Sequence, residues 1–375
     1  MMLLELDSNH AEIKAQPQLA PPNDSPSGEW EERSNFWIKE AANQSGKRRK
    51  RERNPTPLIL NGHGVSLRVE SGALVIRDGF THYPQQQARH RYFPRDLELP
   101  TRILLLDGSG TLSFDVLNWL ADQGVALARV RWTGEVATVA GGNGYAADRG
   151  KLEWQRENRD DQAKRLAFAA DLIRQKLNAS LETLDRFIPD SRARERAIAK
   201  TRLGIERLGH ETFSDMNAIF AIEGECASAY FASWHGLPVQ WNGLARRPVP
   251  NDWHHYSGRS SLAVGIKPEN RNASHPINAM LNYAYAVKLS QMQIDVIADG
   301  YDPILGIMHN SKKGSPALVL DLIEPERPRV DAKVLEFVAN HKFAGADFVV
   351  KRDGVCRLSP QIARAVATLV ATPNK

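Results

Sequence analysis

Cysteine is nearly absent from this sequence: Cys226 and Cys356 are the only two in 375 residues. Two such thiols exclude a disulfide framework and a structural zinc site, and they are typical of a protein from a reducing compartment. No apolar run approaches the roughly 20 residues of a membrane helix. The opening residues are followed at once by Glu5 and Asp7, which a secretory signal would not contain. We therefore expect a cytoplasmic protein that makes no contact with a membrane.

The sequence also lacks a strong excess of charge of one sign. The formal net charge is +5 and the isoelectric point is about 9.1. Residues 1–55 hold nine basic and nine acidic residues, so the whole excess lies in the remaining chain. A moderately basic body is compatible with binding a polyanion, but this feature alone selects no partner.

The first 55 residues are predicted to form a poorly ordered extension. Residues 16–28 are rich in Pro, Ser and other turn formers, a composition that disfavours a packed core. Lys47–Arg51 is a compact basic run. It would serve equally well as an electrostatic tether for nucleic acid or as a solvated linker before the first strand.

The remaining chain is predicted to have an α+β fold. A small, mostly-β N-terminal domain (residues 56–147) should precede a larger, all-α domain (residues 148–375). Alternating segments at Ser66–Glu70 and Ala73–Arg77 flank a Ser-Gly turn, and Arg102–Leu106 is typical of a buried strand. Apolar residues then recur at helical spacing, which predicts a helix over 112–123 and a hairpin over 125–139. It also predicts helices near 159–187, 191–208, 213–235, 276–299 and 331–340.

Two motifs suggest binding sites, one for a dinucleotide and one for a metal, but both are weak. Gly108-Ser-Gly110 lies between a strand and a helix, as in a dinucleotide-binding loop, but Ser113 stands where the third glycine is needed. A plain strand-to-helix turn is the better prediction. His254 and His255 are adjacent, so their side chains face different directions and are poorly placed to share a metal.

One loop and the helix after it carry a stronger chemical signal. His309 precedes a short loop that ends in Ser315 and Pro316, which we predict to be the N-cap and first residue of a helix. Asp321 and Glu324 lie three residues apart, so both carboxylates should project from one face of that helix. An imidazole facing two carboxylates suits Mg²⁺ or Mn²⁺ better than structural zinc. In a basic protein, such a metal indicates phosphodiester chemistry.

Glu223 is a third acidic candidate, from an otherwise apolar helix. Its neighbours Phe220 and Tyr230 are predicted to be buried, and burying a lone carboxylate is costly unless a cation or hydrogen bonds compensate. A metal would compensate it, and so would a buried arginine. Glu225, two residues on, points elsewhere on the helix and is the weaker candidate.

Taken in order, these segments resemble a known family, the CRISPR-associated endonuclease/integrase of spacer acquisition, often called Cas-one. The resemblance covers nearly all of the chain from about residue 58 onward. The segments that carry it are Gly108–Val125, Arg165–Asn178, Glu223-Gly224 with Tyr230, Pro276–Tyr285, Tyr301–His309, and Asp321–Pro328 with Asp331. Each is only moderately specific, but their order over some 200 residues makes the resemblance specific.

The resemblance implies that the β domain joins two copies into a homodimer and that the helical domain is catalytic. It implies one catalytic metal, Mg²⁺ or Mn²⁺, held by Glu223, His309 and Glu324. Asp321 would lie beside them, either as a further ligand or behind the ligands.

The sequence departs from the family pattern in three places. Glu324 stands where the family often has Asp, and it should still reach a metal. His275-Pro276 replaces a usual Asp-Pro pair. The N-terminal extension is not a family feature.

The resemblance further implies insertion of short DNA fragments, new spacers, into a CRISPR array by attack of a 3′-hydroxyl on a target phosphodiester. Double-stranded and branched DNA would be substrates, and the small protein Cas-two would be a partner in an integration complex. Lys312, Lys313, Arg259 and Arg271 are candidate DNA contacts from their charge and sequence position. A solvated surface role suits each of the four equally well.

Two other functions remain open. A solitary relative would act as a mobile-element integrase or as a nuclease on branched DNA. A catalytically idle DNA-binding scaffold is the third possibility, but a scaffold has no reason to keep three metal ligands.

Overall fold

The computed structural model describes residues 27–43, 53, 57–80, 87–130, 136–140, 148–259, 273–310, 315–351 and 354–371. The strands in chain order are β1 (Leu58–Glu70), β2 (Ala73–Arg77), β3 (Arg89–Tyr92), β4 (Arg102–Leu112), β5 (Ala126–Val130), β6 (Val136–Ala140), β7 (Gln240–Asn242), β8 (Lys342–Ala344), β9 (Phe348–Val350) and β10 (Cys356–Leu358). The α-helices are α1 (Ser27–Asn43), α2 (Phe114–Asp122), α3 (Arg149–Asp160), α4 (Gln162–Phe187), α5 (Arg192–His210), α6 (Met216–Ala232), α7 (Pro276–Ala298), α8 (Ala317–Leu322), α9 (Arg327–Asn340) and α10 (Pro360–Ala371). Three 3₁₀ turns complete the set, η1 (Asn251–Trp253), η2 (Glu324–Glu326) and η3 (Gly345–Asp347).

The first six strands form one sheet in the order β3-β2-β1-β4-β5-β6. The predicted Ser-Gly turn is confirmed: Ser71 and Gly72 both have positive φ, of 50° and 76°, and join β1 to β2 as an antiparallel hairpin. Positive φ at both central residues matches the right-handed twist of the flanking strands. The central strand β4 runs parallel to β1 and to β5, whereas the outer pairs are antiparallel.

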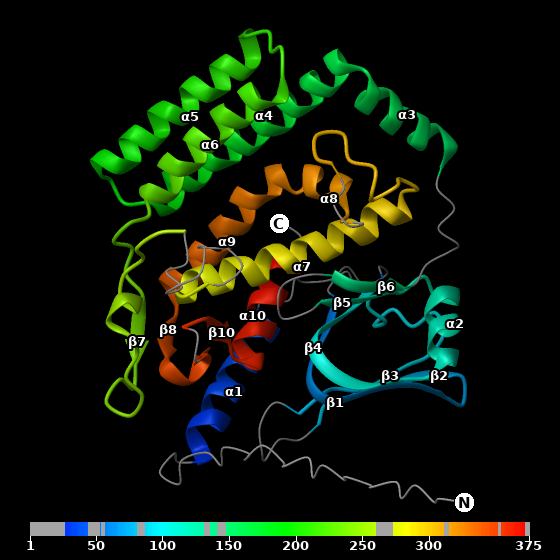
Figure 1. Ribbon diagram of the computed structural model, residues 1–375. Helices are drawn as coiled ribbons and strands as arrows, with labels where there is room; N and C mark the ends of the chain where they lie inside the picture. The colour runs from blue at the N-terminus through cyan, green and yellow to red at the C-terminus, as the bar shows by residue number, and fades with distance from the viewer. Residues whose placement is uncertain are drawn as a thin grey trace, which may run out of the picture.

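Both faces of the sheet are covered. On one face, Leu60 and Ile103 pack with Val116 and Leu120 of α2. On the other face, Leu104 belongs to a cluster with residues of α7 and α10. Neighbours along one strand point to opposite faces, so a strand buried on both sides needs a continuous apolar run, which β4 has. The strand-rich part therefore shares a hydrophobic interface with the helices that follow it (Figure 1).

The predicted turn at Gly108–Gly110 is wrong, because β4 continues through these residues to Leu112. A Cβ on Gly110 would lie 1.8 Å from the carbonyl oxygen of Val65 on β1. Glycine is needed here for the close approach of two strand backbones, at a point where the β1–β4 register also shifts. The role of these glycines is therefore to allow strands β1 and β4 to pair closely.

Beyond residue 148 the chain is mainly helical, as predicted. Helices α4, α5 and α6 pack side by side, and α7 lies between them and the sheet (Figure 1). Two small sheets, β7 with β8 and β9 with β10, were not expected in this part. The α+β class with an N-terminal sheet is confirmed. No helix in the described ranges has the length and apolar character needed to cross a membrane.

The predicted disorder of residues 1–55 is wrong for the segment that forms α1. Ser34, Trp37 and Ala41 recur at helical spacing and are buried, with Trp37 only 1% exposed. Trp37 packs against Phe337 and Phe343, with ring centroids 5.2 and 5.9 Å away. Composition misled the prediction, because the turn-forming residues lie before this helix. The basic run at 47–51 lies outside the described residues.

Candidate functional site

Glu223 and Glu324 meet at a shared cation, Lys176. The Nζ atom of Lys176, on α4, lies 2.5 Å from Oε1 of Glu223 on α6 and 2.7 Å from Oε2 of Glu324 at the start of η2. The exposed fractions of these side chains are 14%, 24% and 12%. The sequence left open whether a metal or a buried arginine would compensate Glu223. In this structure a lysine does so, and it compensates Glu324 as well.

Arg327 adds a second positive charge beside Glu324. Its Nε atom donates to Oε1 of Glu324 over 3.0 Å. Burial favours the neutral acid, but the adjacent Arg327 and Lys176 outweigh it and hold the pKa of Glu324 below its usual value. Burial likewise opposes the charge on Lys176, yet Glu324 and Glu223 raise its pKa. Both shifts favour the charged forms of Glu324 and Lys176 at neutral pH.

His309 is oriented by Asp321. The Nδ1 atom of His309 lies 2.7 Å from Oδ1 of Asp321, which also accepts the backbone N–H of His309 over 2.8 Å. The other carboxylate oxygen accepts the N–H groups of Ile307 and Met308 over 2.7 and 2.9 Å. This fully buried carboxylate thus holds both the loop and the ring. Nε2, at the opposite edge of the ring, is the nitrogen placed to bind a ligand.

The hydrogen bond to Asp321 is also the main cause of the raised pKa of His309. Burial acts in the other direction and is the smaller effect. Phe220 stacks on the imidazole with its ring centroid 6.0 Å away. Ring position and protonation of His309 are therefore both set by its neighbours.

The predicted helix start and shared carboxylate face are wrong in detail. Pro316 occupies the N-cap position, and α8 begins one residue later and ends at Leu322. Glu324 opens the 3₁₀ turn η2, and Pro325 follows with no backbone N–H to continue the helical ladder. Asp321 and Glu324 therefore point in different directions. Asp321 turns back onto the histidine loop, whereas Glu324 faces α4.

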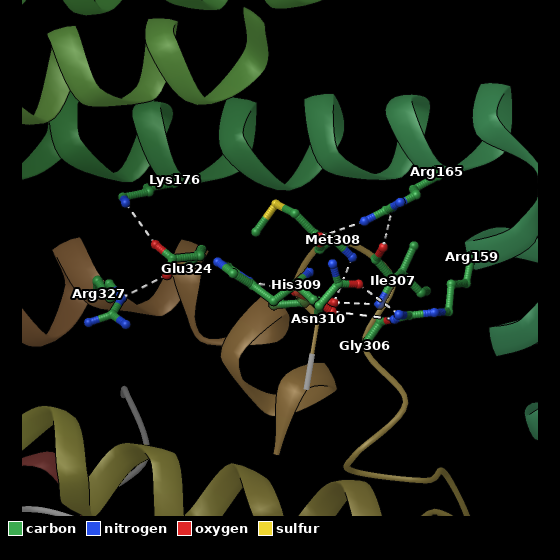
Figure 2. A network of polar contacts seen from close by, with 11 residues as sticks. Arg159, Arg165, Lys176, Gly306, Ile307, Met308, His309, Asn310, Glu324 and Arg327 are labelled. Atoms are coloured by element: carbon green, nitrogen blue, oxygen red, sulfur yellow. Dashed lines mark hydrogen bonds and ion pairs between the residues drawn. The ribbon is translucent and has the colours of Figure 1, made fainter. Parts of the chain in front are cut away.

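Two arginines that the sequence analysis did not single out hold the histidine loop (Figure 2). Arg165 of α4 donates to the carbonyls of Ile307 and Met308 over 2.8 and 3.2 Å. Arg159 of α3 donates to the carbonyl of Gly306 and to Oδ1 of Asn310, the latter over 2.7 Å. Arg165 and Lys176 lie eleven residues apart, about three helical turns, so they share a face of α4. That spacing was the one sequence signal that would have linked them.

Glu223, His309 and Glu324 line one cavity of about 340 Å³. Asp321 is not part of its wall. Lys176, Arg259 and Arg327 are the basic side chains among the residues lining it. Of the four predicted DNA contacts, Arg259 donates to Asn282 over 2.7 Å at this cavity, and Lys312, Lys313 and Arg271 lie outside the described residues.

A second buried network adjoins the same cavity. The hydroxyls of Tyr230 and Tyr285 both donate to Asp331, from Tyr230 over 3.0 Å. Burial raises the pKa of Asp331 to about 6, although the two tyrosine hydrogen bonds work against the rise. The sequence identified these residues only as parts of family motifs, because nothing local shows that two tyrosines from separate helices share one acid.

One known protein family matches most of this chain. The family described as CRISPR associated protein Cas1 matches residues 58–371. The chain belongs to the Cas1 family. The predicted resemblance is confirmed, and the family match begins after α1.

Curated relatives and solved structures match this chain over different shares of its length. A Cas1 endonuclease from Korarchaeum cryptofilum is 25% identical over 75% of this chain and 77% of its own length. A Cas4/Cas1 fusion from Rhodospirillum rubrum is 32% identical, and that match spans 55% of this chain but only 33% of the fusion. The fold is similar to that of a casposase bound to an integration product, with a TM-score of 0.68, 22% identity and coverage of 84% and 81%. A Cas1 protein from Thermotoga maritima has a TM-score of 0.60, 14% identity and coverage of 84% and 89%.

The donor atoms suit the metal that the sequence predicts, although their present positions do not form a closed site. Within the described ranges, no three His, Cys, Asp or Glu side chains are close enough together to hold a metal ion. The distances to Lys176 place the two glutamate oxygens at most about 5 Å apart. Hard divalent cations bind carboxylate oxygens at about 2.0–2.6 Å, so a cation in the place of the ammonium would reach both. The two glutamates would fit a metal in place of the Lys176 ammonium.

Proposed function

We propose that this Cas1 chain is a metal-dependent DNA integrase and endonuclease that inserts short DNA fragments into a CRISPR array. The observation that carries the proposal is the convergence of Glu223, His309 and Glu324 on one cavity, with Asp321 fixing the imidazole. Two carboxylates and one imidazole from separate elements are an expensive arrangement for stability alone. In a Cas1 chain they suit phosphodiester exchange.

Glu223, His309 and Glu324 would hold the metal, which we propose to be Mg²⁺ or Mn²⁺. When bound, the metal would supply positive charge to the scissile phosphate and to its incoming and departing oxygens. Asp321 holds the proton on Nδ1 of His309 and so keeps Nε2 as the ligand atom. Arg327 keeps Glu324 ionised, which a ligand to a hard cation requires.

The reaction exchanges one phosphodiester for another. The 3′-hydroxyl oxygen of the fragment loses its proton to solvent and forms a bond to the target phosphorus. The bond from phosphorus to the target strand's own 3′-oxygen breaks, and that oxygen takes up a proton from solvent to become a new 3′-hydroxyl. No external energy source is needed. Water in place of the hydroxyl gives hydrolysis, and the reverse exchange takes apart a branched product.

DNA would approach on the basic side of the cavity. Arg259 and Arg327 line it with Lys176, and guanidinium groups pair well with phosphate oxygens. We keep Lys312, Lys313 and Arg271 as proposed DNA contacts on the grounds of charge and sequence position. Phosphate contacts of this kind position the duplex without reading its sequence.

We also propose that the chain works as a homodimer with Cas2 in the cytoplasm. One solved structure with a TM-score of 0.60 to this chain is a Cas6-RT-Cas1–Cas2 complex. On this chain, Phe114 is 88% exposed and Leu112 is 43% exposed, at the junction of β4 and α2. Apolar side chains gathered at one exposed place are typical of a protein interface, which favours the sheet as the dimer contact.

A strand-transfer assay tests the proposed activity. Purified protein, alone and with Cas2, is mixed with Mn²⁺ or Mg²⁺, a labelled duplex with a free or a blocked 3′ end, and a plasmid carrying the repeat. We expect joining that needs both the metal and the free 3′-hydroxyl. Glu223→Ala and His309→Ala should abolish it while leaving DNA binding intact. Glu225→Ala, an exposed acid two residues from Glu223, is the matched control and should remain active.

Two results would contradict the proposal. Full joining by the Glu223→Ala and His309→Ala variants would remove the metal site. Nicking that ignores the 3′ end, with no joined product even in the presence of Cas2, would support a nuclease in place of an integrase.

A further inference from the structure

Lys176 occupies the space that a metal held by Glu223 and Glu324 would need. Its Nζ atom contacts one oxygen of each carboxylate, at 2.5 and 2.7 Å. These are the distances of charge-assisted hydrogen bonds, and they leave no room for a second cation between the same two oxygens. The ammonium and a metal therefore exclude each other at this place.

The charge balance of the site also shows that the Lys176 ammonium and a metal exclude each other. Glu223 and Glu324 carry two negative charges, which Lys176 and the adjacent Arg327 balance. A divalent cation that entered beside an unmoved Lys176 would leave the buried group with a large positive excess. Like charges at such short range in a partly buried site repel strongly. The metal is accommodated only if the ammonium leaves.

The Lys176 ammonium has the freedom to move away from the two carboxylates. It projects from α4 on a flexible four-carbon stem, whereas Glu324 is also held by a hydrogen bond from Arg327. The cavity of about 340 Å³ begins beside its side chain. Arg327 has less freedom, because its Nε donates to Glu324 and its guanidinium also lies over the Tyr285 ring, 5.1 Å from the ring centroid.

We propose that Lys176 is a tethered cation that competes with the divalent metal for Glu223 and Glu324. This inference rests on the proposed function, because it concerns the same metal site. In the metal-free protein Lys176 keeps the two carboxylates together and offsets their repulsion. Metal binding has to displace it, so the lysine weakens the apparent affinity for metal and removes any need for metal in folding.

The test measures metal binding directly. Metal-free full-length protein is titrated with Mn²⁺, and free Mn²⁺ is counted by electron paramagnetic resonance; melting temperatures are recorded with and without the metal. For Lys176→Gln we expect half-saturation at an Mn²⁺ concentration at least about tenfold lower than for the wild type. We also expect a lower melting temperature without metal and a larger rise on adding it. Lys164→Gln, an exposed lysine on the same helix, should behave as the wild type.

Lys176→Arg gives a second test that does not depend on the Gln variant being well folded. A guanidinium pairs with two carboxylates more firmly than an ammonium does, so this variant should bind Mn²⁺ more weakly than the wild type. Equal or tighter Mn²⁺ binding by Lys176→Arg would overturn the inference.

The remaining outcomes separate this inference from the proposed function. In one outcome, Mn²⁺ binding is saturable and is lost in Glu223→Gln, but it is equally strong in the wild type and in Lys176→Gln. That result would show that Lys176 does not compete with the metal, and it would leave the proposed metal site intact. Absence of saturable binding in the wild type and in both Lys176 variants would overturn the metal site and the inference with it.

Discussion

The imidazole of His309 and the carboxylate of Asp321 are joined by a hydrogen bond of 2.7 Å, and the same carboxylate accepts three backbone N–H groups from the histidine loop. One buried acid thus fixes the position, the tautomer and the pKa of a residue that would bind the metal through its other nitrogen. Neither the ring nor its loop can move without breaking these bonds.

Replacing Asp321 with Asn tests this relationship. An amide cannot accept all four hydrogen bonds, so the ring loses its fixed orientation and the pKa of His309 should fall toward its usual value. Changes of this kind behind a metal ligand typically cost about 10–100-fold in metal affinity or activity. We expect a loss of that size in strand transfer, and a lowered His309 pKa by NMR titration.

The exposed acid Asp299 supplies the control for that experiment, since Asp299→Asn removes a charge without touching the loop. Full strand transfer and an unchanged His309 pKa in Asp321→Asn would show that the carboxylate does not orient the ring.

Asp331 should give the fold an unusual pH dependence. Its pKa is about 6, against a usual value of 3.8, so the folded protein holds a proton between these values that the unfolded chain has lost. The contribution of Asp331 to the free energy of unfolding therefore falls as pH rises from about 4 to 6, by about 3 kcal/mol in all. Urea unfolding of the wild type and Asp331→Asn across this range measures it.

The quantity to compare is the stability of the wild type minus that of Asp331→Asn, since other carboxylates titrate equally in both. We expect this difference to decrease with rising pH. A difference that stays constant or increases would mean that Asp331 is ionised in the folded protein throughout.

Local patterns predicted much of the fold. The hairpin at Ser71 and Gly72, the buried strand β4 and the long helices follow from periodicities that act within a few residues. Helix α1 was missed because its position depends on tertiary packing. Trp37 packs against residues some 300 positions away, and most helical stability in proteins comes from such packing.

The site was predicted as a set of residues but not as an arrangement. Glu223, His309 and Glu324 were named from burial and family motifs, and they line one cavity. The cation between the glutamates was not predicted, because Lys176 is 47 residues from one and 148 from the other. No local pattern distinguishes a lysine that will meet two acids from the many that remain in solvent.

Helix α1 should contribute substantially to stability although it lies outside the family match. Trp37 is buried against Phe337 and Phe343 and donates its indole N–H to Asp347 over 3.0 Å. Truncating a buried tryptophan typically costs about 3–5 kcal/mol. We expect a loss of that size for Trp37→Ala in urea unfolding, and less than about 0.5 kcal/mol for its neighbour Ile38→Ala, which is 40% exposed. Equal small losses in both variants would mean that α1 does not pack on the C-terminal helices in solution.

Arg165 should act on catalysis through the histidine loop alone. Its guanidinium donates to the carbonyls of Ile307 and Met308, and hydrogen bonds from charged donors contribute about 1.5–3 kcal/mol each. Arg165→Met should therefore speed amide hydrogen exchange over residues 307–309 and lower strand transfer by at least about tenfold. Lys164→Met, the adjacent exposed cation, should leave both unchanged. If exchange in the loop is unaltered while strand transfer still falls, Arg165 contacts the DNA directly and does not work by positioning His309.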